Sequence, residues 1–176
     1  MTFLWQYLSS SNRSMKDIFE TERLLLSKIT PEDAPFIFKL VNTPGWIKFI
    51  GNRNIKTIDD AKKYINKLLN TANLTYWTVK SKSTSDELGV VTFMKRDYLD
   101  HYDIGFAFLP QHMHKGYAFE ASKEVLNYVL KELKMPTVVA TTLPDNVDSI
   151  RLLEKLGLHF EKTIIIDKIE LSVFST

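Results

Sequence analysis

The sequence contains no cysteine, which excludes disulfide bonds, thiolate metal ligands and a cysteine nucleophile. It also lacks any apolar run near the roughly 18 residues of a membrane-spanning helix, and its first residues have neither the positive region nor the apolar length of a signal peptide. The absence of cysteine fits a reducing compartment. We therefore expect a cytoplasmic protein that has no membrane partner.

An excess of one charge is missing as well. Lysine and arginine total 23 and aspartate and glutamate total 21, so the formal net charge is +2. A pI near 8.6 and the scattered aromatic residues allow a nucleic-acid-binding domain as a hypothesis. The near-neutral balance and the lack of a known binding motif argue against it. We expect no nucleic-acid partner, although a local basic patch could hold a small anion.

The length of 176 residues favours one domain with a sizeable core. We assign residues 20–176 to this domain. Residues 1–19 are either an N-terminal extension, with Met15 as an alternative start, or a short docked helix.

The hydrophobic patterns predict a mixed α/β (α+β) domain. Short connections between residues 75 and 110 indicate an antiparallel meander, and one strand–helix–strand crossover follows it. Pro44 and Gly45 are expected to end the first helix, and residues 46–54 to form a connection. Strands are predicted at 23–29, 75–82, 88–96, 101–110, 137–143, 159–166 and 168–175, and helices at 30–42, 57–70, 117–133 and 145–157.

The stretch "LPQHMHKGYAFEAS", residues 109–122, joins a strand to a helix that opens near Gly116. The first N–H groups of a helix have no partner within it and attract anions. Gly116 permits close approach, Ala118 and Ala121 keep the first turn small, and Lys115 adds positive charge. The stretch matches neither the P-loop nor the dinucleotide-binding pattern. Taken alone, it is also typical of an ordinary turn with an exposed lysine.

A metal site is the alternative for the same stretch. His112 and His114 have H-x-H spacing, but the chain has only two other histidines, His101 and His159, and no thiol. A competent site needs three or four ligands. We therefore expect no metal.

Two segments, "IGFAFLPQHMHKGYAFEA" and the later "DNVDSIRLLEKLGL", together resemble the acetyl-CoA-binding core of the GNAT acetyltransferases. With "ETERLLLSKITPEDAPFIF" before them, they resemble the branch that includes the ribosomal-protein N-terminal acetyltransferases. The family loop reads Q/R-x-x-G-x-G/A. Here it runs from Gln111 to Gly116, with His114 where the first glycine is usual.

This resemblance implies a single domain with a mostly antiparallel sheet that splays open for the pantetheine arm. Main-chain groups of the central strand would bond the arm, the loop N–H groups would hold the diphosphate, and the N-x-x-S match would lie near the sulfur. The residues implied in acetyl-CoA binding are Phe106, Phe108, Leu109, Gln111, His114, Lys115, Gly116, Tyr117, Ala118, Asn146 and Ser149.

The chemistry implied by the resemblance is acetyl transfer to a primary amine by direct attack in a ternary complex. The tyrosine that many relatives use as an acid corresponds to Leu153, so Ser149 is our candidate to bond the sulfur, or is only a binding contact. Asp103 is a candidate base, or a solvated charge at a strand end. Glu120 lies in a first helical turn, where acids are usually structural.

The acceptor would be a small-molecule or peptide amine, bound by a monomer or a homodimer. The segment around residues 46–65 resembles the one that borders the acceptor in this branch, and its aromatic residues could instead be core. An alternative function is a non-catalytic CoA-binding or regulatory module. The candidate acceptor-binding residues are Trp46, Phe49, Asn52, Arg53 and Trp77, with Tyr76 beside them.

Overall fold

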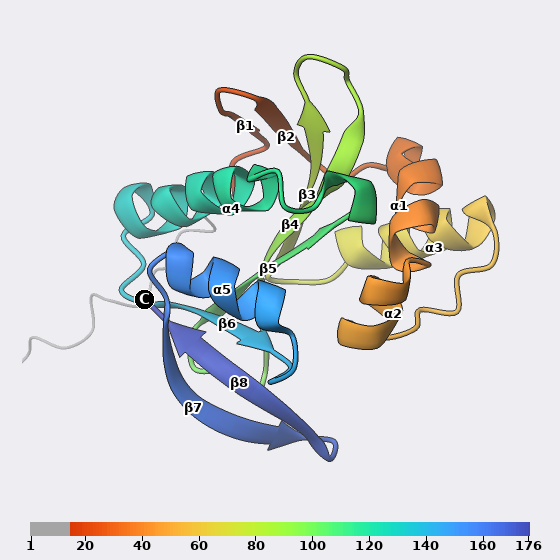
Figure 1. Cartoon of the computed structure of the whole chain (residues 1–176). Coiled ribbons are helices and arrows are strands. Elements are labelled where there is room, and N and C mark those ends of the chain that lie inside the picture. The colour runs from red at the N-terminus through yellow and green to blue at the C-terminus, as the bar shows by residue number, and fades with distance from the viewer. Residues whose placement is uncertain (1–14) are drawn as a thin grey trace, which may run out of the picture.

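One open sheet of eight strands forms the centre of the computed structural model, which describes residues 15–176 (Figure 1). The strand order is β1-β2-β3-β4-β5-β6-β8-β7, and every pair is antiparallel except β5–β6. The predicted class, α/β with a mostly antiparallel sheet and one parallel crossover, is confirmed. The strands are β1 (Ile18–Glu20), β2 (Leu24–Lys28), β3 (Leu74–Ser81), β4 (Glu87–Lys95), β5 (Tyr102–Phe108), β6 (Val138–Thr142), β7 (His159–Ile166) and β8 (Ile169–Ser175).

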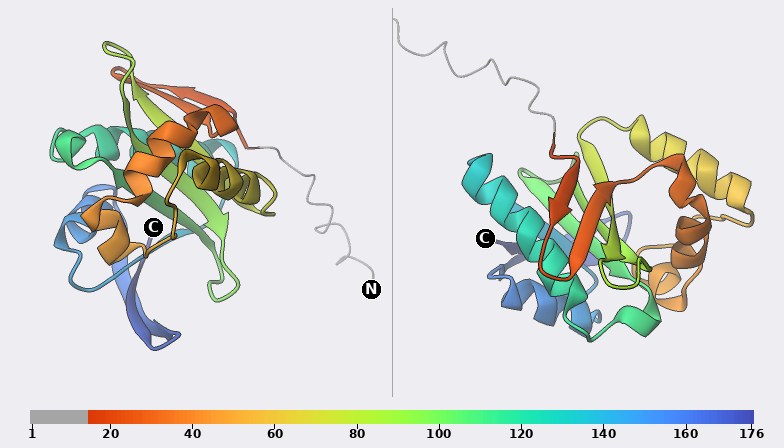
Figure 2. Two further views of the ribbon diagram at one scale, coloured as in Figure 1. Left: turned by 90° about the vertical axis from the view of Figure 1, so that its right-hand side faces the viewer. Right: turned by 90° about the horizontal axis from the view of Figure 1, so that it is seen from above.

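Helices cover both faces of the sheet and enclose a separate apolar cluster on each. The first three pack over one face, while α4 and α5 pack over the other (Figures 1 and 2). A single turn at Pro31–Asp33 leads into α1, and a π-helical turn, Tyr128–Glu132, extends α4. The helices are α1 (Ala34–Val41), α2 (Pro44–Phe49), α3 (Ile58–Leu69), α4 (Tyr117–Asn127) and α5 (Val147–Lys155).

The ends of the predicted helices agree with their capping residues. The side chain of Thr57 accepts a hydrogen bond from the N–H of Asp60, whose carboxylate accepts from the Thr57 N–H, which is a reciprocal capping box at the start of α3. Asn146 caps α5, and Gly157 follows that helix with a φ of +92°. Short polar side chains therefore set these helix starts, and a glycine sets the stop.

Two local predictions were wrong. Pro44 begins α2 instead of only ending α1, because the Thr43 hydroxyl caps the Trp46 N–H at 3.3 Å and proline is tolerated in a first helical turn. Residues 46–49, expected as a connection, are therefore helical. The short strand β1 was not expected at all. The prediction of an extension or a docked helix at residues 1–19 falls mostly outside the described residues.

The sheet opens between β5 and β6. Their ladder consists of Tyr102 paired with Val138 and Asp103 paired with Val139. In the described part of the chain, the rest of β5 therefore has no strand beside it on the β6 side. On its other side β5 pairs with β4 along its whole length, from Tyr102 to Phe108. The result is a gap in the sheet that ends at the loop leading into α4.

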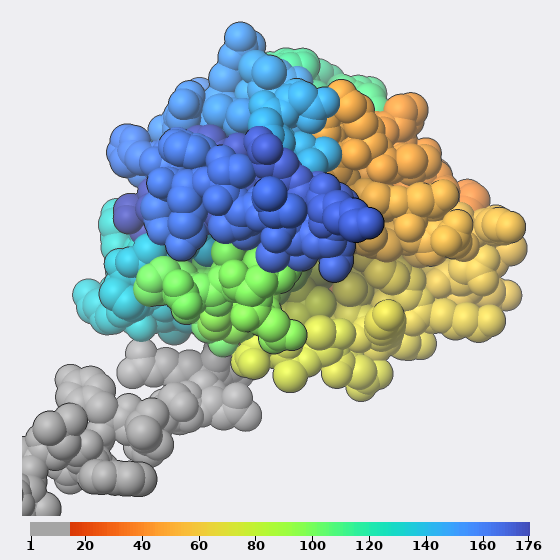
Figure 3. Space-filling model, turned by 90° about the horizontal axis from the view of Figure 1, so that it is seen from below, coloured from red at the N-terminus to blue at the C-terminus, as the bar shows by residue number. Residues whose placement is uncertain are grey.

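The last two strands form a long hairpin at one edge of the sheet, and it extends away from the helices (Figure 2). Seen from below, the blue atoms of the C-terminal part of the chain lie directly beside the orange atoms of α1 and α2 (Figure 3). The ion pair between Lys48 and Asp145, 2.9 Å, joins α2 to the residues just before α5. Among the described residues, no helix is long and apolar enough to cross a membrane.

Candidate active site

The open edge of β5 presents main-chain groups of alternate residues. The N–H of Leu109 donates to the carbonyl of Leu88 at 2.9 Å, so Leu109 faces β4. Successive residues of a strand point their N–H and C=O groups to opposite sides. The main-chain groups of Phe108 and Phe106 therefore face the gap. Leu109 was also expected to offer main-chain groups there, but its N–H donates to Leu88 of β4 and its carbonyl accepts from the His112 N–H at 2.9 Å.

The loop after β5 ends in a left-handed glycine that starts α4. Gly116 is the N-cap residue with φ +81°, and its carbonyl accepts from the Glu120 N–H at 3.0 Å. The helix begins at Tyr117, so the N–H groups of Tyr117 and Ala118 fall in the first turn, where no earlier helical carbonyl can accept from them. Gln111 and Lys115 are exposed beside them. This arrangement suits a diphosphate.

His114 takes the backbone conformation that the usual glycine would take. Its φ is +58°, in the left-handed region, and its side chain is 75% exposed. The imidazole points out of the loop, with Nε2 3.8 Å from Oδ2 of Asp148 in the first turn of α5. The backbone at this position is thus one that glycine takes without strain, and the His114 side chain connects the loop to α5.

The N-terminal end of α5 lies between the loop and α2. On the other side from His114, Lys48 of α2 forms an ion pair of 2.9 Å with Asp145. Asn146 caps the helix by accepting from the Ser149 N–H at 3.3 Å, which leaves the Ser149 hydroxyl out of that bond. The N-x-x-S pair is thus held by its own cap at the gap in the sheet.

Leu153, at the position where the resemblance implies a tyrosine in many relatives, belongs to the hydrophobic core. Leu153 is 1% exposed and packs with the apolar cluster under α4. Its side chain has no acidic proton, so residue 153 cannot act as an acid. Ser149 is partly exposed about one turn earlier in the same helix and can donate a hydrogen bond.

Glu120 has a structural role, through contacts that the sequence did not indicate. One carboxylate oxygen accepts from the Thr21 hydroxyl at 2.6 Å and the Arg23 N–H at 2.9 Å, and the other pairs with Arg23 Nε at 2.6 Å. Burial acts to raise the pKa of Glu120, but these hydrogen bonds outweigh it and lower the pKa. Glu120 therefore ties the first turn of α4 to the β1–β2 turn.

Asp103 is buried, not solvated. It is 2% exposed, its Oδ2 pairs with Nε of Arg96, and its Oδ1 accepts from the Thr141 N–H of β6 at 3.2 Å. Burial raises the pKa of Asp103, while Arg96 and the Thr141 N–H act in the opposite direction. The prediction of a solvated strand-end charge was wrong. Because both oxygens are engaged where β5 and β6 still pair, the geometry favours a structural role over that of a base.

The proposed acceptor residues separate onto two faces of the sheet. Trp46 is 4% exposed on the α1–α3 face, and within the described residues its indole N–H has no hydrogen-bond partner. Trp77 is fully buried on the opposite face, and its indole N–H donates to the carbonyl of Lys16 at 2.9 Å. Trp77 is therefore a core residue and not part of the acceptor site. It follows Tyr76 in β3, and adjacent residues of a strand point to opposite faces of the sheet.

The other residues of the acceptor segment surround α2. Phe49 is partly exposed, whereas Asn52 and Arg53 are exposed in the following loop. The Asn52 side chain accepts from the Asn54 N–H at 2.8 Å, so it shapes its own turn. Tyr76 lies below them in the α1–α3 core, where burial raises the pKa of its hydroxyl. Phe49 and Arg53 remain the candidates best placed to meet an acceptor.

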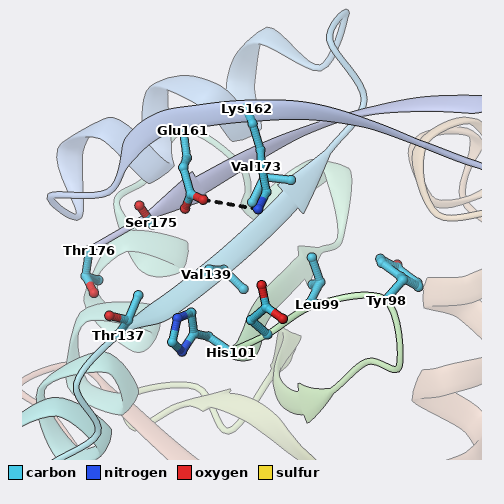
Figure 4. Close-up of a pocket in the computed structure, with 11 residues that line it drawn as sticks. Tyr98, Leu99, His101, Thr137, Val139, Glu161, Lys162, Val173, Ser175 and Thr176 are labelled. Atoms are coloured by element: carbon cyan, nitrogen blue, oxygen red, sulfur yellow. Dashed lines mark ion pairs between the residues drawn. The ribbon is translucent and has the colours of Figure 1, made fainter.

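A separate cavity of about 280 Å³ lies near the opposite end of β5 (Figure 4). Its walls come from the β4–β5 connection, the residue before β6 and the C-terminal strands, including His101, Thr137 and Glu161, which forms an ion pair with Lys162. It is about 20 Å along β5 from the loop before α4. The cavity is therefore not part of the candidate site.

Several contacts of the site could not be anticipated. Arg23, Lys48 and Arg96 are single charged residues, and nothing beside them in the sequence indicates a partner. Each pairs with an acid on another segment. The Asn146 cap, by contrast, binds an N–H only three residues away in the sequence.

The chain is similar to known acetyltransferases in sequence. The family model described as "Acetyltransferase (GNAT) domain" matches residues 23–159. The "Uncharacterized N-acetyltransferase YnaD" of Bacillus subtilis (strain 168) is 30% identical over 141 residues, which cover 80% of this chain and 82% of that protein.

Solved structures share the fold at lower identity. The spermidine N-acetyltransferase from Vibrio cholerae, in complex with CoA and spermine, has a TM-score of 0.75 and 16% identity, covering 89% of this chain and 96% of that one. The ribosomal-protein-S5-alanine acetyltransferase from Vibrio fischeri has a TM-score of 0.74 and 18% identity, covering 90% and 95%. Both likenesses concern the fold alone.

Proposed function

The chain belongs to the GNAT acetyltransferase family, and on this premise we propose that it transfers the acetyl group of acetyl-CoA to a primary amine. One observation carries the proposal. The unpaired edge of β5, with Phe106 and Phe108 facing the gap, leads directly into the left-handed Gly116 and the N-terminus of α4. An extended arm can lie along the strand edge while the diphosphate at its end meets the helix N-terminus.

The residues present fit acetyl-CoA as a co-substrate. Phe106 and Phe108 would offer main-chain groups to the pantetheine, and Gly116, Tyr117 and Ala118 would offer N–H groups to the diphosphate. Lys115 would contribute charge, and Gln111 and His114 would form the outer wall of the loop. A Cβ at Gly116 would come within 3.3 Å of Arg23 Nη2, so a side chain there would crowd the guanidinium beside the loop.

The reaction we propose is direct attack. The neutral amine nitrogen bonds to the thioester carbonyl carbon, the C–S bond breaks, the nitrogen loses one proton and the sulfur gains one. Ser149, at the N-terminus of α5, would donate a hydrogen bond to the sulfur, and Asn146 would hold that turn in place. A main-chain N–H on the edge of β5 would stabilise the oxyanion. Correct placement of both substrates supplies a large part of the rate.

The acceptor would enter beside α2. Trp46, Phe49, Asn52 and Arg53 lie on the side of the sheet opposite α4, and the Lys48–Asp145 pair connects α2 to the segment that bears Asn146. An amine entering from this side would meet the thioester where the sheet opens. The acceptor class we propose is a small-molecule or peptide amine. A cytoplasmic location and a monomeric or homodimeric state remain predictions.

A non-catalytic CoA-binding module is the second candidate, and the burial of Leu153 favours it. Where relatives place a proton donor, this chain has an aliphatic side chain in the core. The binding half of the site does not depend on that position. The two candidates therefore agree on CoA binding and differ on turnover.

The test has two stages. Titration calorimetry should show CoA and acetyl-CoA binding with micromolar affinity, and ligand at 100 times the dissociation constant should stabilise the fold by about 2.7 kcal/mol. No binding would refute both candidates. A thiol-release assay with acetyl-CoA over a panel of peptide N-termini, polyamines and amino-acid analogues then separates them, because only the enzyme releases CoA in an acceptor-dependent way.

A further inference from the structure

A side chain from the β1–β2 turn reaches the loop before α4. Arg23, 92 residues away from Lys115 in sequence, donates from Nη1 to the Lys115 carbonyl at 3.1 Å. Its guanidinium lies over the ring of Tyr117, with Cζ 4.6 Å from the ring centre. Nη2 faces Gly116 closely, 3.3 Å from where a Cβ would stand. The guanidinium therefore lies along residues 115–117, where the loop passes into α4.

Glu120 holds this guanidinium in one orientation. Its carboxylate binds both the main-chain N–H and the Nε of Arg23, so the arginine is fixed at two points before its outer nitrogens reach the loop. Thr21 adds a third hydrogen bond to the same carboxylate. The Glu120 side chain is 19% exposed, which limits competition from water. The network thus joins a rigid helix turn, a strand turn and the loop.

The bond to the Lys115 carbonyl controls where the next N–H points. A trans peptide is planar, and its C=O and N–H point in opposite directions. When Arg23 holds the Lys115 carbonyl, the Gly116 N–H of the same peptide must point away from the guanidinium. Without that bond the peptide could rotate readily, because glycine tolerates positive and negative φ alike. The hydrogen bond from Arg23 to the Lys115 carbonyl therefore fixes the direction of the Gly116 N–H, which would donate to the diphosphate.

We propose that Arg23 is a positioning residue of the diphosphate loop: it orients the Lys115–Gly116 peptide for the co-substrate without itself being the phosphate ligand. The inference rests on the proposed function, since it assumes that the loop binds CoA. It adds a determinant from the β1–β2 turn, outside the loop. A lysine at position 23 could carry the charge but could not bond Glu120 and the Lys115 carbonyl in the fork geometry of arginine.

The experiment compares two ligands that differ in the diphosphate. Arg23→Gln and Arg23→Lys are titrated with CoA by calorimetry, and their binding of millimolar pantetheine, which lacks the diphosphate and the nucleotide, is followed by thermal shift. Both variants should weaken CoA binding by about tenfold to a hundredfold, as expected for a lost charge-assisted hydrogen bond. The response to pantetheine should not change. In turnover, KM for acetyl-CoA should rise while kcat changes little.

Glu20→Gln is the matched control. It removes the 2.7 Å ion pair between Glu20, the last residue of β1, and Lys82, which follows β3; this pair does not reach the loop. This variant should bind CoA as the wild type does.

Each other outcome has a definite meaning. Unchanged CoA affinity in both Arg23 variants would overturn the inference, as would an equal loss for CoA and pantetheine, which indicates general damage to the fold. Wild-type affinity in Arg23→Lys alone would show that charge, not orientation, matters, and would also overturn it. If the wild type itself binds no CoA, the proposed function fails and takes the inference with it; binding by the wild type confines any failure to Arg23.

Discussion

The imidazole Nε2 of His114 lies 3.8 Å from Oδ2 of Asp148, across the opening between the loop before α4 and the first turn of α5. His114 reaches this place with a left-handed backbone, φ +58°. A non-glycine residue in that region carries a steric cost, which the contact with Asp148 offsets only weakly because both side chains are exposed. The loop therefore holds residue 114 in a conformation that glycine would take without strain.

This backbone predicts a clear contrast between two substitutions of His114. His114→Gly should fold with no loss of stability, since glycine takes a positive φ without strain. His114→Val should lower the free energy of unfolding by about 1 kcal/mol, because a β-branched residue is disfavoured there. Denaturant unfolding of both variants measures the difference. Equal stabilities would show that the loop does not hold residue 114 in this conformation.

The pair formed by Lys48 and Asp145 leads to a prediction about the acceptor. Both side chains are about 60% exposed, so Asp145→Asn should change stability by less than about 1 kcal/mol. The pair nevertheless connects α2 to the start of α5. We expect Asp145→Asn to raise KM for the acceptor and to leave KM for acetyl-CoA unchanged. Asp59→Asn, which removes an exposed pair within α3, is the control and should alter neither constant.

The buried pair of Asp103 and Arg96 should contribute to stability more than to chemistry. Asp103→Asn leaves the partly buried guanidinium without its counter-ion, and we expect a loss of about 2–3 kcal/mol in the free energy of unfolding. Adding Arg96→Met should recover part of that loss, which a double-mutant cycle measures. At a temperature where the single variant is folded, kcat should stay near the wild-type value. A collapse of kcat in a fully folded Asp103→Asn protein would instead identify Asp103 as the base.

Local sequence patterns predicted the elements well where a residue sets its own backbone. The caps at Thr57 and Asn146 and the glycine stop at 157 lie within a few residues of the structure they produce. The site was harder, because its contacts join distant segments. Nothing near Glu120 in the chain indicates that its partner is Arg23, 97 positions away.

The misplacement of Trp77 has a similar physical origin. Tyr76 and Trp77 are both buried aromatic residues of β3, and composition alone does not say which face each one takes. The register with the neighbouring strands assigns Tyr76 to the α1–α3 face and Trp77 to the α4 face. A shift of one residue would exchange them.

Glu120 should make stability depend on pH in a particular direction. Its pKa is below the ordinary value of 4.5, because hydrogen bonds from Thr21 and Arg23 outweigh the effect of burial. A carboxyl with a lowered folded-state pKa adds stability above its unfolded pKa and loses it as the pH falls through the folded pKa. Glu120→Gln should therefore be less stable than the wild type at neutral pH, and the difference should shrink below about pH 4.

Unfolding curves of the wild type and Glu120→Gln across this range provide the measurement. Asp60 serves as a comparison, since its pKa is also lowered, chiefly by the Lys56 N–H and then by Thr57, but within the cap of α3. Asp60→Asn should show the same dependence on pH without any effect on CoA binding. A difference for Glu120→Gln that persists at low pH would mean that its ionised form is not what stabilises the fold.

Gly116 and Gly157 give a matched pair for testing the diphosphate loop. Both have left-handed backbones, with φ +81° and +92°, and both mark the end of a helix, the start of α4 and the stop of α5. Aspartate at either position should cost about 1–2 kcal/mol in folding, because the backbone strain is the same. A Cβ at Gly157 meets nothing within 4 Å, whereas one at Gly116 meets Arg23. Only at Gly116 would the new carboxylate stand at the start of α4, beside the Arg23 guanidinium and next to the N–H groups proposed to hold the diphosphate. Repulsion between like charges costs several kcal/mol, so Gly116→Asp should raise the dissociation constant for CoA by at least about a hundredfold, while Gly157→Asp leaves it unchanged.

Calorimetry on the two folded variants decides between a loop that holds phosphate and one that only turns the chain. If Gly116→Asp binds CoA as tightly as Gly157→Asp does, the diphosphate is not held at the start of α4.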